Sequence, residues 1–224
     1  MFKLIISLAL LFLSGSLIAQ MSKSDSAIVA INLHKDSSLK AMMHTDSLKI
    51  EKEYADKLKE EKLKAIAVYP FLDAGPFSGV IPVKDPTEIP DPALDYKLLF
   101  ELTANNPDSS IAEINYGLTE AARIINLHVA SGIPIKKIIP VLVVHAGALN
   151  AFTNDTYYKS KYKIENPNKK IIDELFKAGV KIIACGQALA FFEISRESLL
   201  PPVKVTLSAK TALSYYRLKG FVPM

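Results

Sequence analysis

The residue types best suited to group-transfer chemistry occur where apolar runs end. Cys185, the only cysteine of the chain, ends the run Val180–Cys185 and is followed by Gly186. His145 ends a second apolar run, and Gly147 follows two residues later. A cysteine thiolate attacks sulfur or carries a persulfide, and a histidine exchanges protons near neutral pH. These positions predict thiol chemistry, with Gly186 leaving room for a ligand near the sulfur and Gly147 suited to a tight turn or a close backbone approach.

The elements around these residues indicate how they are positioned. Strand-like and helix-like segments alternate from Asp95 onward, and the strand-like ones are apolar throughout rather than at alternate positions. Such strands are covered on both faces, which is typical of a mainly parallel α/β sheet. We expect five strands, at 96–103, 137–147, 180–185, 203–208 and 221–224, and four helices, at 110–132, 167–179, 186–194 and 208–220.

Parallel strands place their carboxyl ends at one edge of the sheet, where ligands bind in open α/β folds. Thr103 and Asn105 follow the first predicted strand. We therefore expect these two side chains to line the same pocket as the cysteine, the histidine and the two glycines named above.

Cys185 also precedes the predicted helix 186–194. The free N–H groups and partial positive charge of a helix N-terminus favour a thiolate over a thiol. The alternative is a structural cysteine, since free cysteine is among the most buried residue types. For His145, too, the alternative is a structural role, as a partly buried side chain that hydrogen-bonds to the backbone. No third residue is apparent that would orient it for hydrolysis with Cys185.

Several reaction classes lack their usual sequence support. The chain has no GxGxxG, GxxxxGK[ST], GxSxG or HExxH pattern, which argues against dinucleotide-binding, P-loop, serine-hydrolase and zinc-protease functions. A single cysteine allows no internal disulfide and no cysteine-rich zinc site. The net charge of +4 is too small to indicate nucleic-acid binding. We expect no metal, no cofactor and no nucleic-acid partner.

The first residues predict an exported protein. Lys3 precedes an apolar run, and Ala19 offers a small-residue cleavage point before Gln20, so residues 1–20 are predicted to be a signal peptide. A membrane anchor is the alternative, but the unbroken apolar stretch is short for a span of about 20 residues. After cleavage no stable membrane anchor remains, and the protein is expected to be periplasmic or secreted.

Three more segments complete the predicted organisation. Residues 21–67 are rich in charge and predict a solvated helical extension, whose helix starts with Thr45 or Asp46 as its cap. Residues 68–94 contain six prolines and predict an extended linker. The α/β domain is expected at 95–224, and within it residues 154–170 interleave tyrosine with lysine and predict a long loop.

The predicted domain resembles the DsrE/DsrF-like (YchN-type) sulfur-relay family. The similarity rests on the opening strand "YKLLFELT", the strand end "VVHAG" and the segment "LFKAGVKIIACGQAL". The resemblance implies a flavodoxin-like three-layer fold with a mainly parallel five-stranded sheet, and a trimer or hexamer. It also implies that Cys185 holds a persulfide and passes it to a partner protein, whereas the place of His145 beside it is our inference from geometry.

Two functions of different classes follow. The first is an exported persulfide or thiol carrier that uses Cys185 and meets a sulfur-transfer partner. The alternative is a non-enzymatic homo-oligomeric module that binds a small anion at the strand ends, or that assembles through the helix within 21–67. The sequence leaves open whether the protein turns over a substrate as an enzyme.

Overall fold

The computed structural model describes residues 23–201 and 203–224, so the predicted signal peptide, 1–20, lies outside the described residues. The chain divides into two compact units, Met1–Glu60 and Glu61–Met224. Among the described residues, no helix combines the length and the apolar character needed to span a membrane. All the strand-end residues named above belong to the second unit.

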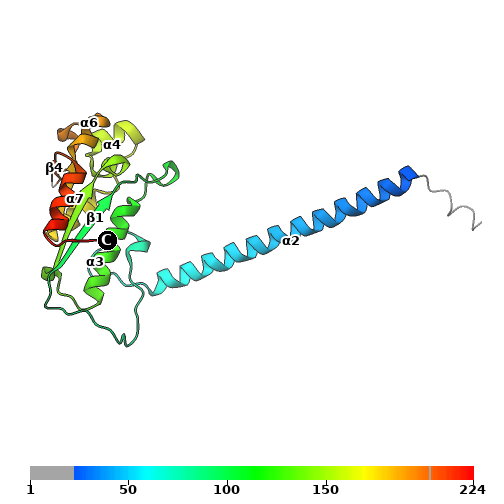
Figure 1. Cartoon of the computed structure of the whole chain (residues 1–224), viewed down its shortest axis with the longest axis horizontal. Coiled ribbons are helices and arrows are strands. Elements are labelled where there is room, and N and C mark those ends of the chain that lie inside the picture. Colours follow the sequence, from blue (N-terminus) through cyan, green and yellow to red (C-terminus); the bar gives the residue numbers. More distant parts are fainter. Residues whose placement is uncertain (1–22, 202) are drawn as a thin grey trace, which may run out of the picture. The chain divides into compact units, whose positions relative to one another are not determined.

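The predicted charged extension forms one helix, α2, from Lys23 to Ile66. Figure 1 shows this helix without a break. It contains neither proline nor glycine, so no residue in it interrupts the backbone hydrogen-bond ladder. The expected start at Thr45 or Asp46 is wrong, because the helix runs through both residues. Between 31 and 60, every side chain that the structure describes is exposed.

Five strands form one parallel sheet, as predicted. They are β1 (Tyr96–Leu102), β2 (Ile138–Val144), β3 (Lys181–Cys185), β4 (Lys204–Thr206) and β5 (Val222–Pro223). Their order in the sheet is β4-β3-β2-β1-β5, and every neighbouring pair is parallel. All five carboxyl ends therefore lie at one edge, which we call the carboxyl edge.

Helices cover both faces of the sheet, which gives the three layers of the predicted flavodoxin-like fold. One face carries α3 (Tyr116–Ala130), α5 (Lys169–Lys177) and α6 (Gly186–Phe191), and the other carries α7 (Ala209–Leu218). Figure 1 shows β1 between α3 and α7. Leu142 and Val144 of β2 enter the core on the α3 face, whereas Val143 and Cys185 enter the core under α7. Each fully buried Leu or Val stabilises the fold by on the order of 1.5–3 kcal/mol.

Capping asparagines set the starts of two helices, one that periodicity alone misplaced and one that was expected to be loop. Asn115 accepts a hydrogen bond from the N–H of Gly117 at 3.0 Å, so α3 starts at Tyr116 rather than at 110. Asn154 accepts from the N–H of Tyr157 at 3.0 Å and starts α4, Asp155–Tyr162. The expectation of a long loop over 154–170 is therefore wrong, since α4 and the start of α5 occupy much of it.

The proline-rich segment predicted as a linker packs against α3. The side chain of Asn126, which is 0% exposed, donates to the carbonyls of Leu72 and Ser78 at 2.7 and 2.9 Å. It also accepts from the N–H of Leu72 at 2.9 Å. Val68 and Val80 form an isolated antiparallel bridge within the segment. The second compact unit thus begins before the predicted domain boundary at residue 95.

Candidate functional site

The ends of β1 and β2 meet at the carboxyl edge. The N–H of His145 donates to the carbonyl of Leu102 at 2.9 Å, which continues the strand pairing past β2. Gly147 then lies against the loop after β1, because a Cβ added at this glycine would sit 3.1 Å from the backbone nitrogen of Asn105. The close backbone approach expected at Gly147 is therefore present, and it is made to the loop that carries Thr103 and Asn105.

Buried asparagines that the sequence analysis overlooked hold these loops in place. Asn115 donates from its side chain to the carbonyl of Ala104 at 3.1 Å, and its backbone N–H donates to Asn168 Oδ1 at 2.6 Å. Asn168 in turn donates to Asn166 Oδ1 at 2.8 Å, and Asn166 donates to the carbonyl of Thr153 at 2.6 Å. Since each of these asparagines is buried, the network gives the carboxyl-edge loops one defined conformation.

Cys185 is the last residue of β3, and its sulfur lies beneath α7. Sγ accepts a hydrogen bond from the N–H of Ala209 at 3.2 Å. Ala209 is the first residue of α7, so the sulfur touches a helix N-terminus, where N–H groups and the helix dipole favour negative charge. We expected α6 to play this part, but the Cys185 side chain makes no capping hydrogen bond to α6. A helix from a distant part of the sequence supplies the favourable contact instead.

The sulfur is shielded from solvent. Cys185 is 5% exposed and packs in a cluster that includes Val143, Ile183, Ala212 and Leu213. Among the described residues, Cys185 does not line the hollow between β1 and α3, the one beside Pro76 and Phe77, or the one between α7 and the β3–β4 edge. A reagent therefore reaches the sulfur only when the residues that cover it move.

Gly186 permits the end of β3 to approach the end of β4. A Cβ added at this glycine would lie 2.8 Å from the carbonyl oxygen of Thr206 and 3.3 Å from that of Leu207. After this contact the chain leaves the two strands toward opposite faces of the sheet. It continues from β3 into α6 on one face and from β4 into α7 on the other. Ligands in open α/β sheets bind at such divergence points. Cys185 and Thr206 are register partners there.

His145 has an acidic partner that the sequence did not reveal. Its Nε2 lies 2.9 Å from Oε1 of Glu101 on β1 and donates to that carboxylate. Their side chains are 20% and 32% exposed. Nζ of Lys210 on α7 lies 3.5 Å from the same oxygen. The hydrogen bond from His145 holds the pKa of the Glu101 carboxyl below its ordinary value of 4.5, and the charge of Lys210 lowers it further.

His145 also lies next to Cys185 across the sheet. Val144 pairs with Ala184, and His145 continues the strand with φ −152° and ψ −179°. The following residues, His145 and Cys185, therefore occupy neighbouring positions on strands about 4.8 Å apart. Ala146 then takes a φ of 51°, in the left-handed region that a residue with a Cβ adopts only at a cost. This strained turn fixes the direction in which the chain leaves His145.

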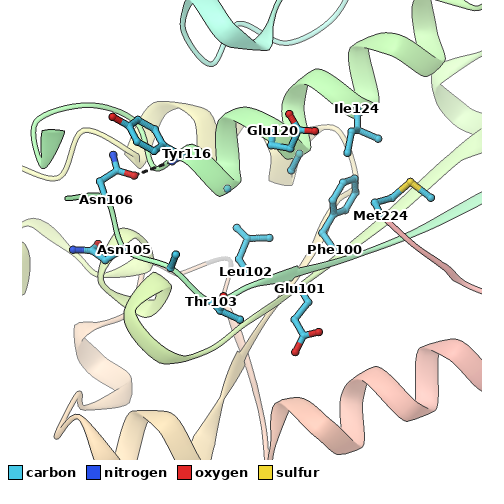
Figure 2. Close-up of a pocket in the computed structure, with 13 residues that line it drawn as sticks. Phe100, Glu101, Leu102, Thr103, Asn105, Asn106, Tyr116, Glu120, Ile124 and Met224 are labelled. Atoms are coloured by element: carbon cyan, nitrogen blue, oxygen red, sulfur yellow. Dashed lines mark hydrogen bonds between the residues drawn. The ribbon is translucent and has the colours of Figure 1, made fainter.

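Thr103 and Asn105 line a hollow on the α3 side of β1, whereas Cys185 packs under α7 on the other side of the sheet. This β1–α3 hollow has a volume of about 440 Å³, and its lining includes Phe100, Thr103, Asn105, Tyr116, Ile124 and Met224. Figure 2 shows the Glu101 side chain pointing away from α3, whereas Ile124 lies on α3 above the hollow. The Asn105 side chain donates to the Tyr162 hydroxyl at 3.1 Å. The structure thus places His145, Cys185 and Gly186 at the ends of the neighbouring strands β2 and β3, whereas Thr103 and Asn105 follow β1 and line this hollow.

The arrangement places a cysteine sulfur against a helix N-terminus, with a histidine that is paired with a carboxylate at the neighbouring strand end. These are the parts needed for transfer of a group to and from sulfur. Within the described residues, no group of three or more His, Cys, Asp and Glu side chains is placed to hold a metal ion.

No curated protein sequence matches the chain. Six chains of solved structures match it. One is a protein of unknown function from Methanobacterium thermoautotrophicum, with 18% identity over 58% of this chain and 98% of its own, and a TM-score of 0.43. The DsrE/DsrF-like family matches residues 97–221, from β1 through α7, a span that includes His145 and Cys185. Because this match covers more than half of the sequence, the chain belongs to the DsrE/DsrF-like family.

Proposed function

We propose that this protein carries sulfane sulfur as a persulfide on Cys185. Membership of the DsrE/DsrF-like family suggests a function related to sulfur relay. The observation that carries the more specific proposal is the hydrogen bond from the Ala209 N–H to Cys185 Sγ at 3.2 Å. Because it comes from a helix N-terminus, this contact favours the thiolate before transfer and the persulfide anion after it.

His145 supports the same role as a proton carrier. With Nε2 donating to Glu101, the imidazole is held with Nδ1 as the nitrogen available to take a proton. Its place beside Cys185 in the sheet lets it accept the thiol proton and return it to a leaving group. Glu101 acts through His145, so it is a positioning residue.

The transfer step conserves electrons and needs no oxidant. Cys185 gives its proton to His145, and the thiolate attacks the outer sulfur of a donor persulfide, R–S–SH. The donor S–S bond breaks, RS⁻ leaves with the bonding pair, and His145 protonates it to RSH. Cys185 then holds the transferred sulfur as Cys185–S–SH, and the reverse sequence with an acceptor thiol delivers it.

Burial of the sulfur suits a carrier that must protect its cargo, but it requires local opening for loading. The covering elements are the first turn of α7 and the strand end that precedes it. Leu207, which lies between β4 and α7, is an exposed apolar side chain. It offers a partner protein an apolar contact next to the elements that cover the sulfur.

Export and self-association are further parts of this proposal. The signal peptide at 1–20 would place the carrier in the periplasm or outside the cell. A homo-oligomer, a trimer or hexamer as the sequence resemblance implies, would be tested by light scattering on the chain without residues 1–20. Deleting residues 21–67 in the same assay tests whether the helical extension holds the subunits together.

The burial of Cys185 also favours a second candidate. In this alternative the cysteine is a packing residue, and the protein is a non-enzymatic module that binds a small anion at the carboxyl edge. The alternative predicts that Cys185 reacts with thiol reagents only after unfolding. It also predicts that Cys185→Ser leaves anion affinity unchanged.

Mass spectrometry of the intact protein tests the proposed function. The folded chain is treated with sodium polysulfide and desalted. The proposal expects a gain of about 32 Da, one sulfur atom, that dithiothreitol reverses. Since Cys185 is the only cysteine, the Cys185→Ser variant is a complete control and should gain nothing. A wild-type chain that gains no mass while folded contradicts the carrier role.

A further inference from the structure

An exposed loop that is rich in proline and in acidic residues precedes the sheet. Residues 81–95, which we call the acidic loop, contain four prolines, four acidic residues and one lysine. Every residue of the loop is exposed, and its apolar side chains Val83, Ile89 and Leu94 are each more than half exposed. Because proline restricts the backbone, the loop loses little conformational freedom when it binds. Long irregular loops of this kind are typical of binding segments.

Most of the negative charge of the acidic loop has no counter-charge in the part of the chain that the structure describes. Asp85, Glu88 and Asp91 form no ion pair there, whereas Asp95 lies 2.9 Å from Nζ of Lys137. The Asp95 pair holds the end of the loop against the sheet. The loop therefore presents three carboxylates to solvent on a segment whose end is anchored.

A hollow of opposite charge lies on the α7 face. This α7 hollow has a volume of about 310 Å³ and lies between α7 and the β3–β4 edge of the sheet. Tyr215 and Tyr216 line it, and so do Lys181 and Lys204. β3, β4 and α7 contain no aspartate or glutamate, and among the described residues neither lysine forms an ion pair. The hollow is thus aromatic and basic.

The acidic loop and the α7 hollow complement each other chemically. Grooves lined by aromatic side chains bind extended proline-rich segments, and lysines across an interface attract carboxylates. Residues 72–80, which lead into the loop, pack against α3, whereas α7 covers the other face of the sheet. None of residues 81–95 lines the hollow of its own chain. The fold therefore leaves both surfaces uncovered, and they can meet between two copies.

We propose that the acidic loop of one copy of this chain docks in the α7 hollow of a second copy. Proline rings of the loop pack on Tyr215 and Tyr216, and carboxylates of the loop pair with Lys181 and Lys204. Because the two surfaces differ, the contact is head-to-tail, and its repetition either closes a ring or extends a filament. This inference rests on the self-association proposed above and names the surfaces that carry it, but it is independent of the persulfide chemistry.

Three variants of the chain without residues 1–20 separate the two surfaces. The loop-neutral chain lacks three carboxylates of the acidic loop, through Asp85→Asn, Glu88→Gln and Asp91→Asn. The hollow-reversed chain has both lysines of the hollow replaced, through Lys181→Glu and Lys204→Glu. The control chain carries the same change of charge on α4 and α5, outside the hollow, through Lys159→Glu and Lys170→Glu.

Binding is measured first with the loop supplied as a separate peptide. The loop-neutral chain is the receptor, because its own loop leaves the hollow free. A fluorescent peptide of residues 81–95 should bind it at one saturable site at low salt, as followed by anisotropy. Adding the hollow-reversed substitutions to the receptor should weaken binding about tenfold or more, whereas adding the control substitutions should change it less than twofold. No saturable binding to the loop-neutral chain overturns the inference.

Light scattering then tests the contact between whole chains. The wild-type chain should form an oligomer at concentrations above the Kd of the peptide, and the control chain should keep the same mass. The loop-neutral and hollow-reversed chains should each be monomers. An equal mixture of these two variants should form dimers, because one intact loop then meets one intact hollow.

The outcomes separate this inference from the proposed function. An oligomer whose mass is the same in all variants supports self-association and overturns the contact named here. A wild-type chain that stays monomeric above the Kd of the peptide overturns both the contact and self-association. Sulfur gain on Cys185 is measured by mass on the same chains, so the carrier role stands or falls separately.

Discussion

Replacement of Glu101 by glutamine is the sharpest test of the role of the His145–Glu101 pair. The substitution keeps the shape of the side chain but removes its charge. Nε2 of His145 then loses a charged acceptor at 2.9 Å, and an amide that donates to Nε2 would turn Nδ1 into a donor. In that tautomer, His145 has no free nitrogen to take the proton of Cys185. The expected result is a slower transfer of sulfur, with the fold unchanged.

The size of the effect follows from the geometry. A hydrogen bond to a charged group contributes about 1.5–3 kcal/mol when it is shielded from water. The His145 and Glu101 side chains are 20% and 32% exposed, so solvent screening reduces the contribution. A remaining loss of about 1–2 kcal/mol in the transition state slows the step roughly 5- to 30-fold.

The assay follows the gain of sulfur on Cys185 with time, by rapid quenching and mass spectrometry at pH 7. Glu120→Gln is the matched control, since Glu120 pairs with Arg123 on α3 and lies on the other side of β1. The control should change the rate less than twofold. Equal rates for wild type and Glu101→Gln, in chains with the same circular dichroism, would refute the role assigned to the pair.

Four other predictions have defined outcomes. Ala146→Gly relieves a φ of 51° and should raise the free energy of unfolding by about 0.5–1 kcal/mol in urea titrations; a decrease contradicts the strain. Asn126→Ala breaks three buried hydrogen bonds and should lower that free energy by about 3 kcal/mol or more, whereas Ser131→Ala at an exposed helix end should change it by less than about 0.5 kcal/mol. The pKa of the Glu101 carboxyl is lower in the folded chain than its ordinary value of 4.5. The Glu101 charge therefore stabilises the fold fully above the unfolded pKa, and this stabilisation is lost as the pH falls through the folded pKa. The difference in the free energy of unfolding between wild type and Glu101→Gln should shrink below about pH 4.5. Cell fractionation should find the mature chain outside the cytoplasm without residues 1–20; an uncleaved cytoplasmic chain contradicts export.

The strands and their common edge could be predicted because their signal is local. Runs such as Val141–Val144 and Ile182–Cys185 are apolar at successive positions, a pattern typical of strands that are covered on both faces. Once the strands are parallel, the ends marked by His145 and Cys185 must lie at one edge. The placement of the cysteine at a strand end therefore followed from composition and order alone.

The contacts that define the candidate site could not be predicted in this way. The Ala209 N–H that reaches Cys185 comes from 24 residues further along the chain, and Glu101 lies 44 residues from His145. Such pairs depend on the order of strands and on which face a helix covers, and neither leaves a periodic signal in the sequence. The one local clue to Glu101 was its position as the only acidic residue of β1.

The asparagine contacts at the carboxyl edge could be predicted from the sequence only in part. Asn115 and Asn154 each cap a helix, a local rule that was available from the sequence. The buried links between Asn115, Asn166 and Asn168 join the loop before α3 to the loop between α4 and α5, and no spacing rule connects Asn115 with Asn168. Capping could thus have been foreseen, whereas the network that holds the carboxyl edge depends on the tertiary fold.

The central claim is that Cys185 reacts from the folded protein. Its most direct test is the rate of labelling by iodoacetamide in native buffer, repeated at rising urea concentrations below the unfolding transition. Our account predicts labelling through local opening, at a rate nearly independent of urea in that range. Labelling that rises with urea in parallel with global unfolding would show that the sulfur is only a core atom, and would contradict the account.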